Sequence, residues 1–209
     1  SCYRYFPDGT IHVAVVDPGV GGTRRPLLVS SSRYVFIGPD NGLFTHIYEE
    51  EQGVEVRQIE NRQYRLDSDG ATFDGRDLFA PAAAWLTKGQ PIGSFGRLVP
   101  NYERLPIAEP AWDKHVMAGH ILYIDRFGNL ISNLTAYHLK EVRGLTKRPE
   151  PYIRIGGITI DGLVRSYAEG SPDTPQALIN SNGYVEVFLK EGRAADRLKV
   201  ERGQRIELC

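Results

Sequence analysis

A run of four small apolar residues, Val13 to Val16, stops abruptly at Asp17 and restricts what this chain can fold into. Three of the four are β-branched, which is typical of a strand buried on both faces, as in a parallel sheet. The loop over residues 18–22 is rich in proline and glycine, so its backbone can approach a ligand closely. Open α/β sheets bind ligands at the carboxyl ends of their strands, which makes Asp17 a candidate site residue. Asp-Pro-Gly is also an ordinary turn sequence.

The pattern of apolar and polar residues divides the chain into an α/β half and a β-rich half. In the first half we expect strands over residues 13–16, 26–30, 34–37 and 54–59, and helices over residues 43–48 and 77–87. Asp77 is the expected N-cap of the second helix. In the second half we expect strands over residues 120–125, 130–134, 176–180, 184–189 and 205–208, a Gly-Gly hairpin over 152–160, and a helix over 136–142.

These elements predict a fold of two domains, joined by a Pro- and Gly-rich stretch over residues 89–112. Residues 1–100 are expected to form an α/β domain with a mostly parallel sheet and helices. Residues 101–209 are expected to form an all-β, barrel-like domain. Because the parallel sheet begins so abruptly, we expect the α/β domain to lack its first strands.

Charge and cysteine content narrow the class of protein. The 25 Lys and Arg residues against 26 Asp and Glu leave a net charge of -1, which favours neither nucleic acid nor an anionic membrane surface. Cys2 and Cys209 lie at opposite ends and form no disulfide framework, and no apolar run is long enough to span a bilayer. We therefore expect a cytoplasmic protein that binds neither nucleic acid nor membrane.

Aspartates in loops that follow apolar runs are the candidates for chemistry: Asp17, Asp40, Asp74, Asp77 and Asp125. Such carboxylates could bind a metal, act as bases or hydrogen-bond a ribose. A Mg²⁺ site would need oxygen ligands from several loops, which the sequence permits without showing. The histidines and cysteines lack zinc spacing, and neither a Walker loop nor a Gly-x-Ser-x-Gly elbow is present.

Five blocks occur in a fixed order along the chain. They are Val-Asp-Pro-Gly-Val-Gly (16–21), Gly-Pro-Asp-Asn-Gly (38–42), Thr-Phe-Asp-Gly-Arg-Asp-Leu-Phe-Ala-Pro-Ala-Ala (72–83), Ile-Asp-Arg-Phe-Gly-Asn-Leu-Ile-Ser-Asn (124–133) and Asn-Ser-Asn-Gly-Tyr-Val-Glu (180–186). Together they resemble the S-adenosylmethionine hydrolases, or hydroxide adenosyltransferases, which are relatives of the fluorinating and chlorinating enzymes. The resemblance covers nearly the whole chain.

The resemblance implies an α/β N-terminal domain and a β-barrel-like C-terminal domain. It further implies a homotrimer whose active sites lie between one subunit's N-terminal domain and a neighbour's C-terminal domain. The implied reaction is hydrolysis of S-adenosylmethionine to adenosine and L-methionine. An activated water attacks the ribose C5′ in line with the breaking bond, and neither a metal nor another cofactor takes part.

In this family an Asp-Arg-His set holds the attacking water. The Asp and Arg fall on Asp17 and Arg24, and this chain has Asp74 in the position of the His. Two neighbouring carboxylates would repel each other, so water activation is expected to differ from the family pattern. Phe73 and Gly75 are expected to line the ribose and nucleophile pocket, and Val20 is assigned to substrate binding.

The remaining positions that the resemblance assigns to the substrate lie in the second half. Asp125, Phe127 and Asn129 fall on positions that hold the methionine end or the base, Ser181, Asn182 and Ala194 on the adenine-binding edge, and Tyr167 on an aromatic residue that stacks on the base. Asp-Arg-Phe-Gly-Asn and Ser-Asn-Gly are also ordinary turn sequences, so a purely structural interpretation exists for both segments.

The chain starts after the family's N-terminal segment, whose Thr-Asp-Phe-Gly-like motif supplies an aspartate that binds the ribose hydroxyls. Two alternatives to the hydrolase therefore stay open. One is a non-catalytic trimer that binds adenosine or S-adenosylmethionine. The other is a carboxylate-based, Mg²⁺-dependent phosphohydrolase.

Overall fold

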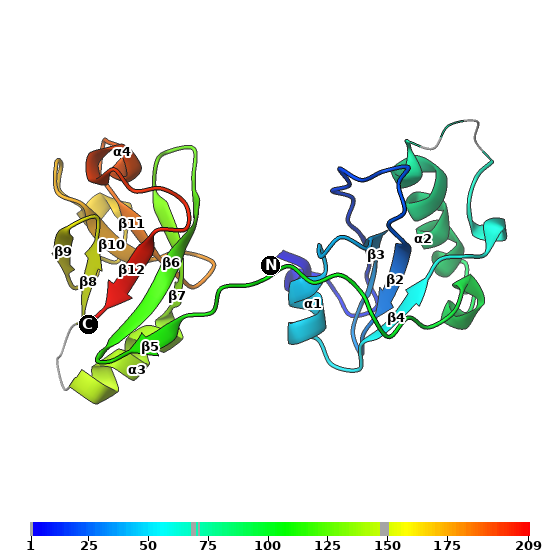
Figure 1. The fold of residues 1–209 in the computed structure, drawn as a ribbon, viewed down its shortest axis with the longest axis horizontal. Coiled ribbons are helices and arrows are strands. Elements are labelled where there is room, and N and C mark those ends of the chain that lie inside the picture. Colours follow the sequence, from blue (N-terminus) through cyan, green and yellow to red (C-terminus); the bar gives the residue numbers. More distant parts are fainter. Residues whose placement is uncertain (1, 68–69, 71, 147–150) are drawn as a thin grey trace. The chain divides into compact units, whose positions relative to one another are not determined.

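The computed structural model describes residues 2–67, 70, 72–146 and 151–209. The chain divides into two compact units, Ser1–Pro106 and Ile107–Cys209, each with its own strands, helices and core (Figure 1). In the described ranges, no helix combines the length and the apolar composition that crossing a membrane requires.

The N-terminal unit is built on a mixed sheet. In the described residues its strands are β1 (Ile11–Val13), β2 (Pro26–Ser30), β3 (Val35–Pro39) and β4 (Glu55–Gln58), in the order β1-β3-β2-β4. β1 is parallel to β3, but β2 is antiparallel to both β3 and β4. The α/β class is confirmed, whereas a mostly parallel sheet is wrong for these strands. Only residues 31–34 connect β2 to β3, which is too short for the crossover that parallel pairing needs.

Helices cover both faces of this sheet (Figure 1). Alternate side chains of a strand point to opposite faces, and β2 follows this rule. Leu27 and Val29 share a core cluster with Ile47 of α1 (Thr45–Glu50), whereas Leu28 shares another with Ala82 of α2 (Ala80–Thr87). The unit is therefore a three-layer α/β structure with a core on each side of the sheet.

The apolar run before Asp17 is not the buried strand that we expected. β1 ends at Val13, and the side chains of Val13, Val15 and Val16 are exposed, that of Val16 by 65%. β1 is an edge strand of the sheet in the described residues and pairs with β3 alone. Its apolar side chains are therefore less covered than those of β2 and β3 in the middle of the sheet.

The helix expected from Asp77 begins earlier, as a π-helix over Gly75–Phe79 that continues into α2. The carbonyl oxygen of Phe73 accepts hydrogen bonds from the backbone N–H groups of both Arg76 and Asp77, each at 2.9 Å. Asp77 therefore lies inside the helical segment, buried and paired with Arg76, so its assignment as the N-cap is wrong. The helix ends at Thr87 as expected.

The C-terminal unit is an antiparallel, nearly closed β-barrel. In the described residues its strands are β5 (Ala111–Asp113), β6 (Val116–Ile124), β7 (Leu130–Thr135), β8 (Tyr152–Ile155), β9 (Ile158–Asp161), β10 (Gln176–Ile179), β11 (Tyr184–Phe188) and β12 (Arg205–Leu208). They run in the order β10-β11-β7-β6-β12-β8-β9, with β5 paired to β6. The two ends of this path, β9 and β10, contact each other. The expected barrel-like domain is confirmed.

Two α-helices of the described residues accompany the barrel. α3 (Ala136–Thr146) extends past its expected end at Val142, and α4 (Ala194–Leu198) precedes β12. The expected hairpin at Gly156 and Gly157 is confirmed: both glycines have positive φ angles, 57° and 79°, as a two-residue turn of this type requires.

Candidate functional site

In the N-terminal unit, the guanidinium of Arg24 lies between two carboxylates. Its Nε donates a hydrogen bond to Asp17 Oδ1 at 3.0 Å, and its Nη2 donates to Asp17 Oδ2 and to Asp74 Oδ2, the latter at 2.5 Å. The side chains of Asp17, Arg24 and Asp74 are only 5%, 12% and 13% exposed. The structure thus gathers the three residues assigned to the water-holding set into one cluster, called here the Asp17–Arg24–Asp74 cluster.

Local backbone structure brings these residues together. The loop after β1 folds back on itself through hydrogen bonds from Val20 N to Asp17 O (3.3 Å) and from Gly22 N to Gly19 O (3.0 Å). This returns the chain to Asp17 by Arg24, just before β2. Asp74 reaches the same place from the start of the π-helix, so the cluster joins a loop to a helical segment far along the sequence.

The cluster carries two negative charges and one positive charge in a partly buried position. Hydrogen bonding to Asp17, followed by that to Asp74, raises the pKa of Arg24 against the opposing effect of burial. The planar fork of a guanidinium suits this bridging, because it donates to several carboxylate oxygens at fixed angles. The repulsion expected between Asp17 and Asp74 is therefore offset by a cation placed between them.

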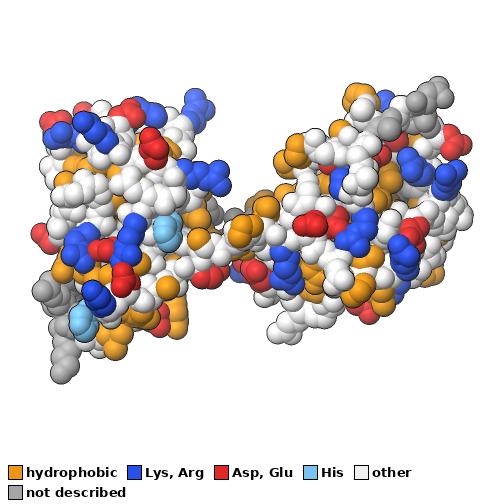
Figure 2. All heavy atoms as spheres, in the orientation of Figure 1, with side chains coloured by type: hydrophobic (Ala, Val, Ile, Leu, Met, Phe, Trp, Pro, Cys, Tyr) orange, Lys and Arg blue, Asp and Glu red, His pale blue; other side chains and the backbone are white. Residues whose placement is uncertain are grey.

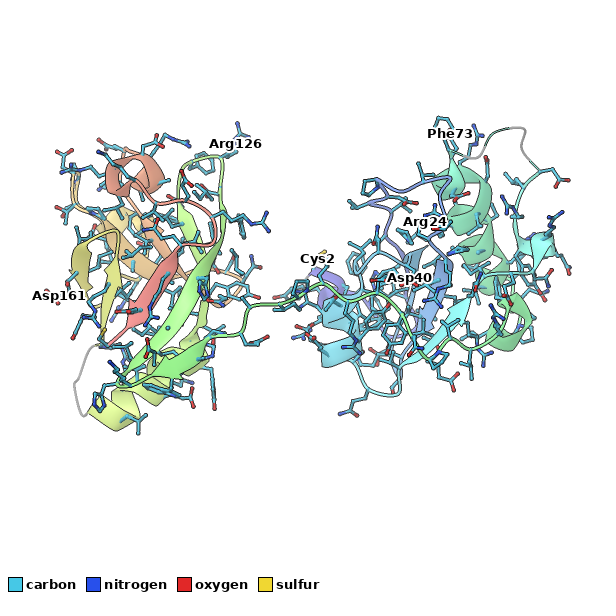
Figure 3. The ribbon with its side chains drawn as sticks, viewed as in Figure 1. Cys2, Arg24, Asp40, Phe73, Arg126 and Asp161 are labelled. Carbon is cyan, nitrogen blue, oxygen red and sulfur yellow. The ribbon has the colours of Figure 1, made fainter. Side chains whose placement is uncertain are left out.

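The adjacent arginine, Arg25, has a separate partner. Its Nε and Nη2 donate to Asp40 Oδ2 at 2.9 and 2.5 Å, while Asp40 Oδ1 accepts a hydrogen bond from the backbone N–H of Glu103 at 2.8 Å. Asp40 is buried and fixes the chain that leaves the unit. Figure 3 shows Arg24 and Asp40 in the N-terminal unit, near one end of the sheet. The two adjacent arginines therefore have different partners: Arg25 binds Asp40, and Arg24 binds Asp17 and Asp74.

The other N-terminal candidates lie around this cluster. Val20 is half-buried in the loop that carries Asp17, and Gly75 lies against Val15, whose Cγ1 would be 3.7 Å from an added Cβ. Phe73 is 61% exposed at the start of the helical segment (Figure 3), with the guanidinium of Arg76 over its ring at 4.9 Å from the centroid. Phe73 thus presents its ring at the surface of the unit, one residue before Asp74 of the cluster.

In the C-terminal unit, Asp125 organises the turn between β6 and β7. Its Oδ1 accepts from the backbone N–H groups of Phe127 (2.8 Å) and Asn129 (2.9 Å), and its Oδ2 accepts from Asn129 Nδ2 (3.1 Å). Gly128 has a φ of 85° in this turn. The interpretation of Asp-Arg-Phe-Gly-Asn as a turn is therefore correct for the backbone of this segment. The exposed ring of Phe127 projects from that turn.

Two cavities share Asp125 and Tyr167 as lining residues, with volumes of about 540 and 430 Å³. The first is also lined by Phe127, Asn129 and Gly192, and the second by Ser181, Asn182 and Glu186. Six of the assigned C-terminal residues thus line adjoining cavities. Ala194 does not, because its side chain is fully buried in the barrel core.

Sequence reasoning did not assign Glu186 a role. The structure buries its carboxylate at the second cavity, where Oε1 accepts a hydrogen bond from the Tyr167 hydroxyl at 2.6 Å. The available signal was a single acid inside the apolar strand Tyr-Val-Glu-Val-Phe, residues 184–188.

Acidic and basic side chains are interspersed over the visible face of each unit (Figure 2). Within the described part of the chain, no three His, Cys, Asp or Glu side chains are grouped as a metal site would need.

Solved structures define the class of this protein. An uncharacterized conserved protein from Thermotoga maritima shares 30% sequence identity and a TM-score of 0.84, over 98% of this chain and 78% of that one. A conserved hypothetical protein from Thermus thermophilus shares 32% identity with a TM-score of 0.73, over 100% and 77%. The chain thus belongs to a class that joins an α/β domain to a β-barrel.

The family follows from sequence comparison. Residues 1–96 match the SAM hydroxide adenosyltransferase N-terminal domain, and residues 119–207 match the C-terminal domain of the same family. The chain belongs to this family. It is 33% identical to an (R)-S-adenosyl-L-methionine hydrolase of Thermus thermophilus, over 98% of this chain and 77% of that protein. It is also 27% identical to a fluorinase of an Actinoplanes species, over 87% and 71%.

Proposed function

We propose that this protein hydrolyses S-adenosyl-L-methionine to adenosine and L-methionine. The observation that carries the proposal is the partly buried Asp17–Arg24–Asp74 cluster, because its residues occupy the positions of the family's water-holding set. The name of the Thermus thermophilus relative, an (R)-S-adenosyl-L-methionine hydrolase, supports the same reaction.

The chemistry requires a positioned water more than a strong acid. The water oxygen forms a bond to the ribose C5′ while the C5′–S bond breaks and its electron pair neutralises the sulfonium. The leaving thioether is neutral and needs no proton. The attacking water loses its proton to a carboxylate. Orientation of the water in line with the breaking bond, in a site that excludes bulk solvent, supplies a large part of such rate enhancements.

The cluster suits this task. Asp17 orients the water and accepts its proton, and Arg24 holds Asp17 through two hydrogen bonds while stabilising hydroxide character electrostatically. Asp74 takes the place of the family's histidine. It accepts a hydrogen bond from Arg24 and so helps to fix the orientation of the guanidinium. The net charge of the cluster stays negative, which favours binding of a neutral water over binding of a free anion at this position.

The C-terminal cavities hold the substrate in this proposal. Asp125 pairs with an ammonium group, Phe127 and Tyr167 provide aromatic walls, and the amide of Asn129 supplies both a donor and an acceptor. Ser181 and Asn182 contribute polar groups at the second cavity. The resemblance further supports a homotrimer with active sites shared between subunits, and analytical ultracentrifugation measures the number of subunits.

The test is incubation of the purified protein with S-adenosylmethionine in metal-free buffer, followed by chromatography for adenosine and methionine. Asp17→Ala should abolish both products. Asp8→Asn is the matched control, since Asp8 forms a surface ion pair with Arg33 in the same unit. Failure to cleave S-adenosylmethionine, together with Mg²⁺-dependent release of phosphate from a phosphate ester that a chelator abolishes, would favour the phosphohydrolase alternative. Binding of adenosine without any turnover would indicate a binding protein. That outcome would fit the presence of Asp74 where the family has a histidine.

A further inference from the structure

Glu186 is a buried carboxylate in the middle of β11, 4% exposed. Its neighbours Val185 and Val187 pack into the barrel core, so alternation places Glu186 and Phe188 on the opposite face of the strand. No Lys or Arg in the described residues forms an ion pair with it. An isolated buried charge is costly unless hydrogen bonds satisfy it, so the bonds that this carboxylate accepts call for a functional explanation.

The first hydrogen bond comes from Tyr167, a residue that lines both cavities. Its hydroxyl donates to Glu186 Oε1 at 2.6 Å, and its ring packs edge-on against Phe188 with centroids 5.0 Å apart. Burial and, next, the hydrogen bond to Glu186 raise the pKa of the phenol above its ordinary value of 10.0. The phenol therefore keeps the proton that it donates, and β11 holds the aromatic ring at two points.

The second hydrogen bond comes from Asn180, at the turn that carries Ser181 and Asn182. Asn180 Nδ2 donates to Glu186 Oε2 at 3.1 Å. Its Oδ1 then accepts from the backbone N–H groups of Asn182 at 3.0 Å and Tyr184 at 3.1 Å. Because one carboxylate fixes the orientation of this amide, it also fixes the backbone of the turn.

We propose that Glu186 is a positioning residue for the nucleoside ligand. It holds Tyr167 on one wall of the 430 Å³ cavity and the Ser181–Asn182 turn on another, so the cavity is shaped before the ligand arrives. A site formed in advance binds more tightly, because ordering of its side chains is not subtracted from the binding free energy. This inference rests on the proposed function for the identity of the ligand, S-adenosylmethionine or its product adenosine.

The test is Glu186→Gln, which keeps the shape of the side chain but removes its charge. We expect the Kd for adenosine, measured by calorimetry, and the KM for S-adenosylmethionine to rise about tenfold, because charge-assisted hydrogen bonds become neutral ones. The kcat should change less than about threefold, since the bound geometry is still reached. Glu207→Gln is the matched control: Glu207 is an acid on β12 paired with Arg154 and Arg205, and its variant should bind adenosine normally.

A double-mutant cycle identifies the route of the effect. Tyr167→Phe and Glu186→Gln should be strongly non-additive in adenosine binding, because each removes the same hydrogen bond. Additive effects, an unchanged Kd in Glu186→Gln, or an equal loss in Glu207→Gln would each overturn the positioning role while S-adenosylmethionine hydrolysis by the unmodified protein stands. An unmodified protein that neither binds nor hydrolyses these compounds would overturn the proposed function, and this inference with it.

Discussion

Replacement of Arg24 by lysine tests the candidate catalytic cluster most directly. The variant keeps a positive charge but loses the planar fork that reaches two carboxylates at once. Arg24 donates from Nε and Nη2 to Asp17, and from Nη2 to Asp74. An ammonium group at the same place can satisfy one carboxylate well, so about two of these three contacts are lost.

The size of the effect follows from those contacts. A hydrogen bond to a charged group contributes about 1.5 kcal/mol or more, so two of them amount to about 3 kcal/mol. If this orientation is needed only when the water attacks, the loss is expressed in the transition state. Each 1.36 kcal/mol is a factor of ten in rate, so kcat/KM should fall by about two powers of ten.

The assay is the initial rate of adenosine formation, with thermal unfolding measured in parallel. Arg25→Lys provides a matched control, because it removes the neighbouring guanidinium from Asp40 and leaves the Asp17–Arg24–Asp74 cluster intact. Its kcat/KM should stay within about threefold of the unmodified protein. A folded Arg24→Lys variant with a rate equal to that of Arg25→Lys would refute the assignment of Arg24 to water activation.

Three other outcomes are expected from the same structure. Asp74→Asn should lower kcat/KM about tenfold through loss of one charge-assisted hydrogen bond, and Asp74→His should restore part of it; an unchanged rate in Asp74→Asn would contradict the role of Asp74 in holding Arg24. Burial among aromatic rings lowers the pKa of His12 from 6.5, so the folded state takes up its proton less readily than the unfolded state. Stability should therefore be full above about pH 6.5 and fall as the pH drops below it, and His12→Phe should flatten this dependence of Tm; equal slopes would contradict it. Gly38→Ala should destabilise the protein by about 2 kcal/mol, because its Cβ would lie 2.3 Å from a backbone oxygen, whereas Gly93→Ala, with open space around it, should change the unfolding midpoint in urea little.

The sequence predicted correctly those elements whose conformation depends only on residues close together in the chain. The Gly156-Gly157 turn is one example, since two positive φ angles are a property of those residues themselves. The valines before Asp17 are the counterexample. Their composition predicts burial, but burial depends on what lies on the far side of the strand, and β1 is at the edge of its sheet in the described residues.

The candidate site also has a part that the sequence could predict and a part that only the tertiary structure shows. The assignment of Asp17, Arg24 and Asp74 came from a family pattern, and no local rule places residue 74 beside residue 24. The π-helix that begins beside Asp74 has no recognised sequence signal, and the local pattern therefore favours Asp77 as the helix cap. The role of Glu186 depends on which strand face meets Tyr167, and alternation alone cannot distinguish the two faces of a barrel strand.

The edge that β1 leaves open in the described residues is a place where the sheet can be extended. An unpaired strand edge presents backbone N–H and C=O groups to which a further strand can bind. A strand paired there would also cover the apolar side chains of Val13, Val15 and Val16, and would turn an edge of the sheet into its interior.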